Sequence, residues 1–165
     1  MRVGSRQVSV LLLGVVLSTG CGGAERSEGG AITTGGDAST FKLRVGDCFN
    51  DPEGLAESKG PAEAETVVAI PCTKSHDNEV FAVVRHPGSD DARFPGAKTI
   101  EAFWTEKCGE RFAGYVGRTF EDSRFSLGAL FPTKDSWGLK DDRISACILY
   151  QEGTKINGSK KGTRK

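Results

Sequence analysis

Residues 71–84, PCTKSHDNEVFAVV, contain the features from which the rest of the fold can be placed. The preceding residues 66–70 (TVVAI) are mostly β-branched and predict a strand that stops at the proline. Residues 78–85 carry apolar side chains at alternating and intervening positions, which predicts a central strand with both faces covered. Cys72 and His76 lie between these strands, so the stretch joins the predicted sheet to residues suited to chemistry.

One long helix is predicted downstream, after Pro95 and Gly96. Apolar side chains in residues 97–116 recur at i, i+3 and i+4, which predicts an amphipathic helix that Gly117 ends. Its apolar stripe consists of Ile100, Phe103, Trp104, Cys108, Phe112, Tyr115 and Val116.

Three further strands are predicted at residues 41–49, 124–131 and 143–150, where apolar and polar side chains alternate. Residues 132–142 are predicted to form a loop. These elements predict an α+β fold, with a small, mostly antiparallel sheet and one main amphipathic helix.

The N-terminus has the organisation of an export signal. Arg2 and Arg6 precede a run of ten apolar residues, 8–17, which is too short to span a bilayer. The small residues before Cys21 are similar to the lipobox of bacterial lipoproteins, although Ser18 stands where leucine is usual. We therefore predict cleavage before Cys21 and a lipid anchor on its thiol at the extracytoplasmic face of the cell membrane; secretion without a lipid is the alternative.

Composition divides the rest of the chain. Residues 1–20 are the predicted lipoprotein signal peptide and residues 21–40 a flexible Gly/Ser-rich tether with a reach of about 25 Å. Residues 41–150 hold most of the aromatic side chains and form the predicted domain, and residues 151–165 are a predicted basic, disordered tail. Lysine plus arginine equals aspartate plus glutamate, 22 each, so no nucleic-acid partner is expected.

Four cysteines remain beside Cys21, an even number that implies disulfides in an exported domain. Of the three pairings, we favour Cys48 with Cys72, at two strand ends, and Cys108 with Cys147, from the helix stripe to the last strand. A four-cysteine zinc site is the alternative, but the closest pair is separated by 24 positions, far from the usual short spacing.

His76, Asp77 and Glu79 are the candidates for a polar site, because a histidine with two carboxylates can bind a metal or share a proton. The competing interpretation makes Asp77 a turn residue and lets His76 bond to nearby backbone. Trp137 either covers the edge of the core or offers a binding anchor. Asp141, Asp142 and Arg143, before the last strand, are expected to form a structural ion pair, with a ligand-facing cluster as the alternative. We expect no catalytic residue, metal or cofactor.

Five short motifs follow one another along the chain: GDCF (46–49), PC with HDNEVFAVV (71–84), FPG before the helix (94–96), FPT with SW (131–137), and DDR with the last cysteine (141–147). Together they resemble the septum-formation domain of actinobacterial membrane proteins and lipoproteins. The resemblance covers residues 41–150 and implies an exported domain with a link to cell-division septa and no established enzymatic activity.

The expected function is therefore a membrane-anchored lipoprotein with a non-enzymatic binding or scaffolding domain, whose partner is an envelope or division protein. The alternatives are an envelope metal-dependent hydrolase that uses His76, Asp77 and Glu79, and a lipoprotein that binds a small solute.

Overall fold

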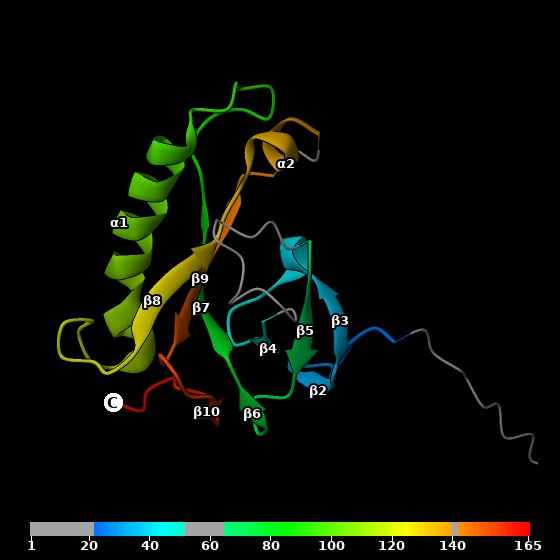
Figure 1. Ribbon diagram of the computed structural model, residues 1–165, viewed down its shortest axis with the longest axis vertical. Helices are drawn as coiled ribbons and strands as arrows, with labels where there is room; N and C mark the ends of the chain where they lie inside the picture. The colour runs from blue at the N-terminus through cyan, green and yellow to red at the C-terminus, as the bar shows by residue number, and fades with distance from the viewer. Residues whose placement is uncertain (1–21, 52–64, 140–141) are drawn as a thin grey trace, which may run out of the picture.

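The computed structural model describes residues 22–51, 65–139 and 142–165 (Figure 1). Its centre is a six-stranded sheet in which every neighbouring pair is antiparallel. In spatial order the strands are β3 (Gly36–Ser39), β5 (Thr66–Ile70), β4 (Cys48–Asn50), β7 (Asn78–Arg85), β9 (Ile144–Tyr150) and β8 (Ser126–Leu130). Two small pairs complete the strands: β1 (Glu25–Arg26) with β2 (Ile32–Thr34), and β6 (Ser75–His76) with β10 (Ile156–Asn157).

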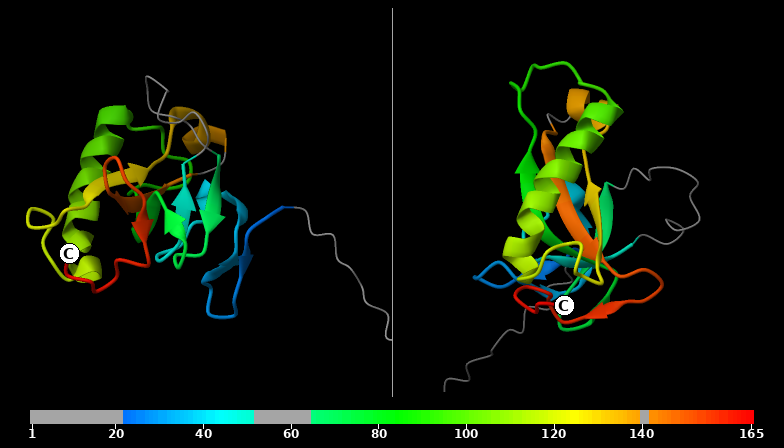
Figure 2. Two further views of the ribbon diagram at one scale, coloured as in Figure 1. Left: turned by 60° about the horizontal axis from the view of Figure 1, so that its bottom comes forward. Right: turned by 90° about the vertical axis from the view of Figure 1, so that its left-hand side faces the viewer.

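Helix α1 (Ala97–Val116) lies over β7, β8 and β9 and covers one face of that half of the sheet (Figures 1 and 2). It begins and ends where the sequence predicts. Gly117 ends it with a φ of 83°, a left-handed conformation that glycine adopts without steric cost, and its N–H donates to the Ala113 carbonyl.

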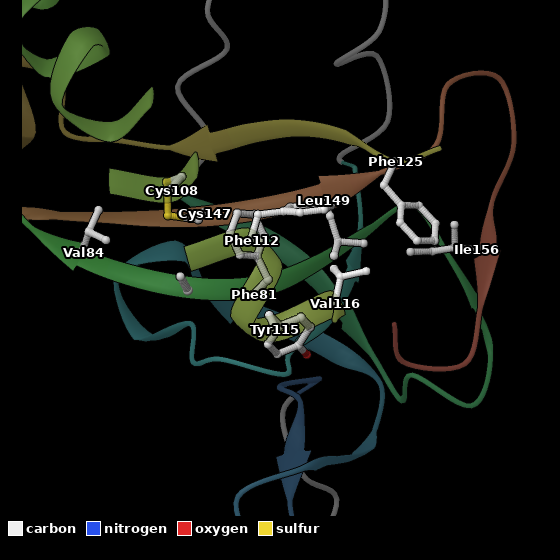
Figure 3. Packing of buried hydrophobic residues seen from close by; sticks show 11 residues of the cluster. Phe81, Val84, Cys108, Phe112, Tyr115, Val116, Phe125, Cys147, Leu149 and Ile156 are labelled. Carbon is white, nitrogen blue, oxygen red and sulfur yellow. A yellow bond between two sulfur atoms is a disulfide. The ribbon is translucent and has the colours of Figure 1, made fainter. Parts of the chain in front are cut away.

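The main core lies between α1 and the sheet (Figure 3). Phe81 meets the edge of Phe112 at 5.4 Å between ring centroids, and Leu149 and Val116 are fully buried beside them. A second cluster lies on the other face of the sheet, so β7 is covered on both sides as predicted. Its buried members are Leu43, Phe49, Val67, Val80 and Ala146.

Both predicted disulfides are present, Cys48–Cys72 and Cys108–Cys147. The first joins β4 to the segment after β5, and the second joins α1 to β9 inside the main core. Loop-closure entropy assigns each a stabilisation of about 3–4 kcal/mol, because they close loops of 24 and 39 residues in the unfolded chain.

The predicted flexible tether is wrong over its described part. Residues of β3 form the outer strand of the main sheet through four register pairs with β5, and Ile32 of β2 is only 8% exposed. The carboxylate of Asp47 receives two hydrogen bonds from the Arg26 guanidinium, at 2.6 and 2.7 Å, and this raises the pKa of Arg26. The glycine and serine content of this segment suggested disorder, but contacts with the sheet edge and one ion pair hold it in an ordered conformation.

The predicted disordered tail is also wrong. Ile156, the one aliphatic side chain of the tail, is 3% exposed and pairs with His76 in the β6–β10 ladder. Further along, the N–H groups of Gly162 and Arg164 donate to the carbonyls of Tyr115 and Val116. The tail therefore satisfies backbone acceptors that the last turn of α1 leaves without partners inside the helix.

Two elements differ from the sequence prediction. Instead of one strand over residues 41–49, the chain forms a 3-10 helix, η1 (Thr40–Lys42), then a turn, and only then β4. The turn forms because Gly46 has a φ of 92° and the Asp47 carboxylate accepts the Arg44 N–H. The predicted loop with Trp137 contains a short helix, α2 (Lys134–Leu139). Among the described residues, no helix is both long and apolar enough to cross a membrane.

Candidate functional site

The carboxylate of Glu79 is the centre of a buried polar cluster. In β7, Glu79 lies opposite Cys48 of β4 and Leu149 of β9, and its side chain is fully buried. Oε1 accepts hydrogen bonds from the Tyr115 hydroxyl at 2.7 Å and from the Ser159 hydroxyl at 2.5 Å. Oε2 accepts the Lys160 backbone N–H at 2.7 Å.

Burial shifts the pKa values of the groups around this carboxylate. Desolvation and the hydrogen bond to Glu79 raise the pKa of Tyr115, so its hydroxyl stays a donor at neutral pH. Desolvation lowers the pKa of Lys160, whose ammonium donates to the Asn157 carbonyl. The Glu79 carboxylate thus connects strand β7 of the sheet to α1 and to the tail.

His76 is fully buried beside this cluster. Its Nδ1 lies 2.7 Å from the Lys74 carbonyl oxygen. A carbonyl only accepts hydrogen bonds, so Nδ1 carries the proton and donates. In the neutral ring, Nε2 then has no proton. Among the residues that the structure describes, Nε2 has no hydrogen-bond partner. Burial lowers the pKa of His76 and so favours this neutral form.

Ligand atoms of Cys48, His76 and Glu79 lie within 4.8 Å of one another, which is the geometry of a partial metal site. However, the Cys48 sulfur is bonded to Cys72, and only a thiolate is a good metal ligand. Asp77 points elsewhere: its carboxylate pairs with the Lys155 ammonium at 2.6 Å. Of the three polar residues singled out by sequence, His76 and Glu79 therefore lie close together and Asp77 does not. With Cys48 in a disulfide, the metal ligands that the described residues bring together here are His76 and Glu79 alone.

An open pocket of about 460 Å³ lies beside Asp77, on the other side of β7 from the buried cluster. Among its lining residues, the Asn78 amide donates to the Asp51 carboxylate at 2.7 Å, and the backbone N–H of Asp51 donates to the Asp77 carboxylate at 3.2 Å. Three carboxylates and one ammonium give the lining an acidic balance. The lining residues are Asp51, Asp77, Asn78, Tyr150, Gln151, Glu152, Gly153, Thr154 and Lys155.

A third polar cluster joins residues that sequence reasoning did not connect. The Ser145 hydroxyl lies 2.8 Å from Nε2 of His86, although the two are 59 positions apart. Both are buried, at 0% and 3% exposed, and burial lowers the pKa of His86, so this serine–histidine pair is out of reach of a substrate. No local pattern in the sequence signals it.

Trp137 and Arg143 belong to the same region. The Arg143 guanidinium stacks 3.8 Å from the centroid of Trp137 and donates to the backbone carbonyls of Trp137 and Asp90. The indole N–H of Trp137 donates to the Ala92 carbonyl. Because Trp137 is 3% exposed, it covers the core edge and is not a binding anchor. Arg143 is held mainly by carbonyls and the indole ring, so the expected ion pair with Asp142 is not what fixes it.

The chain matches the septum formation family over residues 45–163, which include the tail as well as the core. It belongs to the septum formation family. No curated protein and no solved structure gives a significant match to it. Membership supports a role in septum formation or the cell envelope, and the predicted lipidation site, Cys21, lies outside the described residues.

Replacing Glu79 with glutamine should release the tail. The Gln amide keeps one acceptor oxygen where Glu79 has two, so in either orientation its NH2 group replaces an acceptor of Tyr115 and Ser159 or of Lys160. We expect the free energy of unfolding to fall by about 1–3 kcal/mol, and amide hydrogen exchange to accelerate over residues 156–164. Glu152→Gln, at an exposed position, is the matched control. Equal protection of the tail in both variants would contradict this role of Glu79.

Stability should fall on mild acidification. The pKa of His76 is lowered in the folded state, so below about pH 6.5 the unfolded chain binds a proton that the folded chain does not. The free energy of unfolding should therefore decrease between about pH 7 and pH 5, and the decrease should be smaller in His76→Asn, whose amide can still donate to the Lys74 carbonyl. Denaturant titrations of both proteins at pH 7 and pH 5 measure the two decreases. His86 is present in both proteins, so its contribution is the same in each. A histidine NMR titration midpoint above 6.5 for His76 would contradict the prediction.

Proposed function

We propose that this protein is a lipoprotein, anchored through Cys21 to the outer face of the cytoplasmic membrane, whose domain is a non-enzymatic binding module in septum formation or envelope assembly. Family membership supports the process, and the export signal followed by a lipobox-like sequence supports the anchor. The partner that we propose is an envelope or division protein.

The observation that carries a binding role is the open pocket beside Asp77. Its volume of about 460 Å³ lies within the range of known ligand sites. Asp51, Asp77 and Glu152 outnumber its one lysine, Lys155, so the lining favours amino or guanidinium groups of a partner over anionic groups. This chemistry suits a basic peptide segment.

The buried clusters favour binding over hydrolysis. Glu79 and His76 are fully buried, and the Glu79 oxygens already accept three hydrogen bonds. The hydrolase alternative needs the Asp77 carboxylate to act together with His76. That carboxylate is paired with Lys155 instead. A small solute is the second candidate ligand, on the basis of the pocket volume.

Cys21→Ala tests the anchor. Without the thiol no diacylglycerol can attach, so we expect an unprocessed precursor or release to the medium, and loss of acyl labelling from the protein. Fractionation of cells grown with a labelled fatty acid measures both effects. Unchanged labelling in the variant would contradict an anchor at Cys21.

A photo-crosslinking amino acid at Thr154 tests the pocket. Thr154 is exposed and lines it, whereas Thr119, after the end of α1, is also exposed and is distant in sequence from every lining residue. We expect irradiated cells to yield one protein adduct from position 154, absent from position 119 and weakened by Asp77→Asn. Identical adducts from both positions would contradict a partner site in the pocket, and competition by a cell-extract metabolite would favour a small solute.

A further inference from the structure

The first described residues after Cys21 are fixed to the edge of the main sheet. The Asp37 N–H donates to the Gly22 carbonyl at 3.0 Å, and the Ala24 N–H donates to the Asp37 carbonyl at 3.1 Å. Gly23 and Asp37 thereby form a parallel bridge, so residues 22–24 continue the sheet beyond β3. The chain enters beside β3, at the opposite end of the molecule from α1 (Figures 1 and 2).

Gly36 makes this close approach possible. A Cβ at position 36 would lie 2.5 Å from the Gly22 carbonyl oxygen, 2.7 Å from the Gly23 carbonyl carbon and 2.8 Å from the Ala24 nitrogen. All three are backbone atoms that cannot rotate away, so only glycine admits the segment. The ion pair between Arg26 and Asp47 then holds the next residues, since the carboxylate of Asp47 is almost completely buried.

The distance between a lipid on Cys21 and the domain follows directly. Consecutive Cα atoms are about 3.8 Å apart, so the lipidated residue lies within one such step of Gly22, which is bonded to β3. A flexible tether of twenty residues would instead allow about 25 Å. The anchor leaves almost no slack between the bilayer and the edge of the sheet.

The surface next to this point is suited to lipid headgroups. Val68 lies opposite Asp37 in the β3–β5 ladder and is 43% exposed, a high value for a valine in the second strand of a sheet. Thr66, on the same face of β5, is also exposed. Asp37, exposed on the same face as Val68, is the one charged side chain of β3 and β5, so a single carboxylate must be desolvated when this edge meets an interface.

We propose that the β3 edge of the main sheet rests on the membrane surface and that α1, over the opposite half of the sheet, points away from it, toward the periplasmic or wall side. This inference depends on the anchor at Cys21 proposed above. The occupant of this edge is the headgroup region of the bilayer that the anchor enters. The domain is then held in one orientation, which presents a constant side to its partners.

The test uses the lipidated protein, reconstituted in vesicles of phosphatidylethanolamine and phosphatidylglycerol. An environment-sensitive fluorophore is attached to the cysteine of Val68→Cys or of Val83→Cys. Val83, on β7, is the control because it is 39% exposed, close to the 43% of Val68. Mass spectrometry first establishes that Cys21 is acylated. We expect blue-shifted emission and quenching by spin-labelled lipid at position 68, and water-like emission without quenching at position 83.

Two further variants restore the slack. A ten-residue Gly/Ser insertion between Cys21 and Gly22 leaves the fold intact, and Gly36→Ala displaces residues 22–24; both should shift the emission at position 68 toward the value in water. Gly29→Ala, whose new Cβ meets only Ser27 Oγ at 3.8 Å, should change nothing. Acylated protein with water-like emission at position 68 overturns the inference alone, whereas an unacylated Cys21 overturns the anchor itself. If the insertion leaves the emission at position 68 unchanged, the short connection between Cys21 and the sheet is not the cause of the membrane contact.

Discussion

A carboxylate buried without donors costs several kcal/mol, and the fold of this protein is arranged around meeting that demand at Glu79. Three donors come from two places: Tyr115 near the end of α1, and Ser159 and Lys160 in the tail. The strand places the acid, the helix crosses above it, and the tail returns to complete its hydrogen bonds. If any one of these parts moved away, an unsatisfied charge would remain in the interior.

The same logic applies at a second buried acid, Asp47, whose backbone carbonyl accepts the N–H of Val80 beside Glu79. Asp47 is nearly as buried as Glu79, and the Arg26 guanidinium satisfies it from a segment whose composition suggests disorder. Together with the contact at Gly36, this ion pair draws the N-terminal segment onto the domain. The N-terminal segment from residue 22 and the C-terminal tail are thus both part of the domain.

Sequence reasoning succeeded where the signal was local. The period of the helix stripe, the β-branched strand before Pro71 and the two cysteine pairs all appear in the structure as predicted. It failed where a long-range partner decides the outcome. Ile156 is one aliphatic residue in a polar tail, and only its pairing with His76 makes it a strand. Ser145 and His86 come together across 59 residues without any shared motif.

The candidate site divides in the same way. The sequence marked His76, Asp77 and Glu79 as polar and close together, and that much followed from their order in the chain. It could not say that Asp77 turns outward to an open pocket while Glu79 and His76 turn inward, because a turn and strand register decide which side each residue faces. By itself, then, the sequence determined the disulfide links and the class of fold, both of which depend on residue type and spacing. The tertiary structure alone decided which charges are buried and which segments are ordered, because both depend on partners distant in the chain.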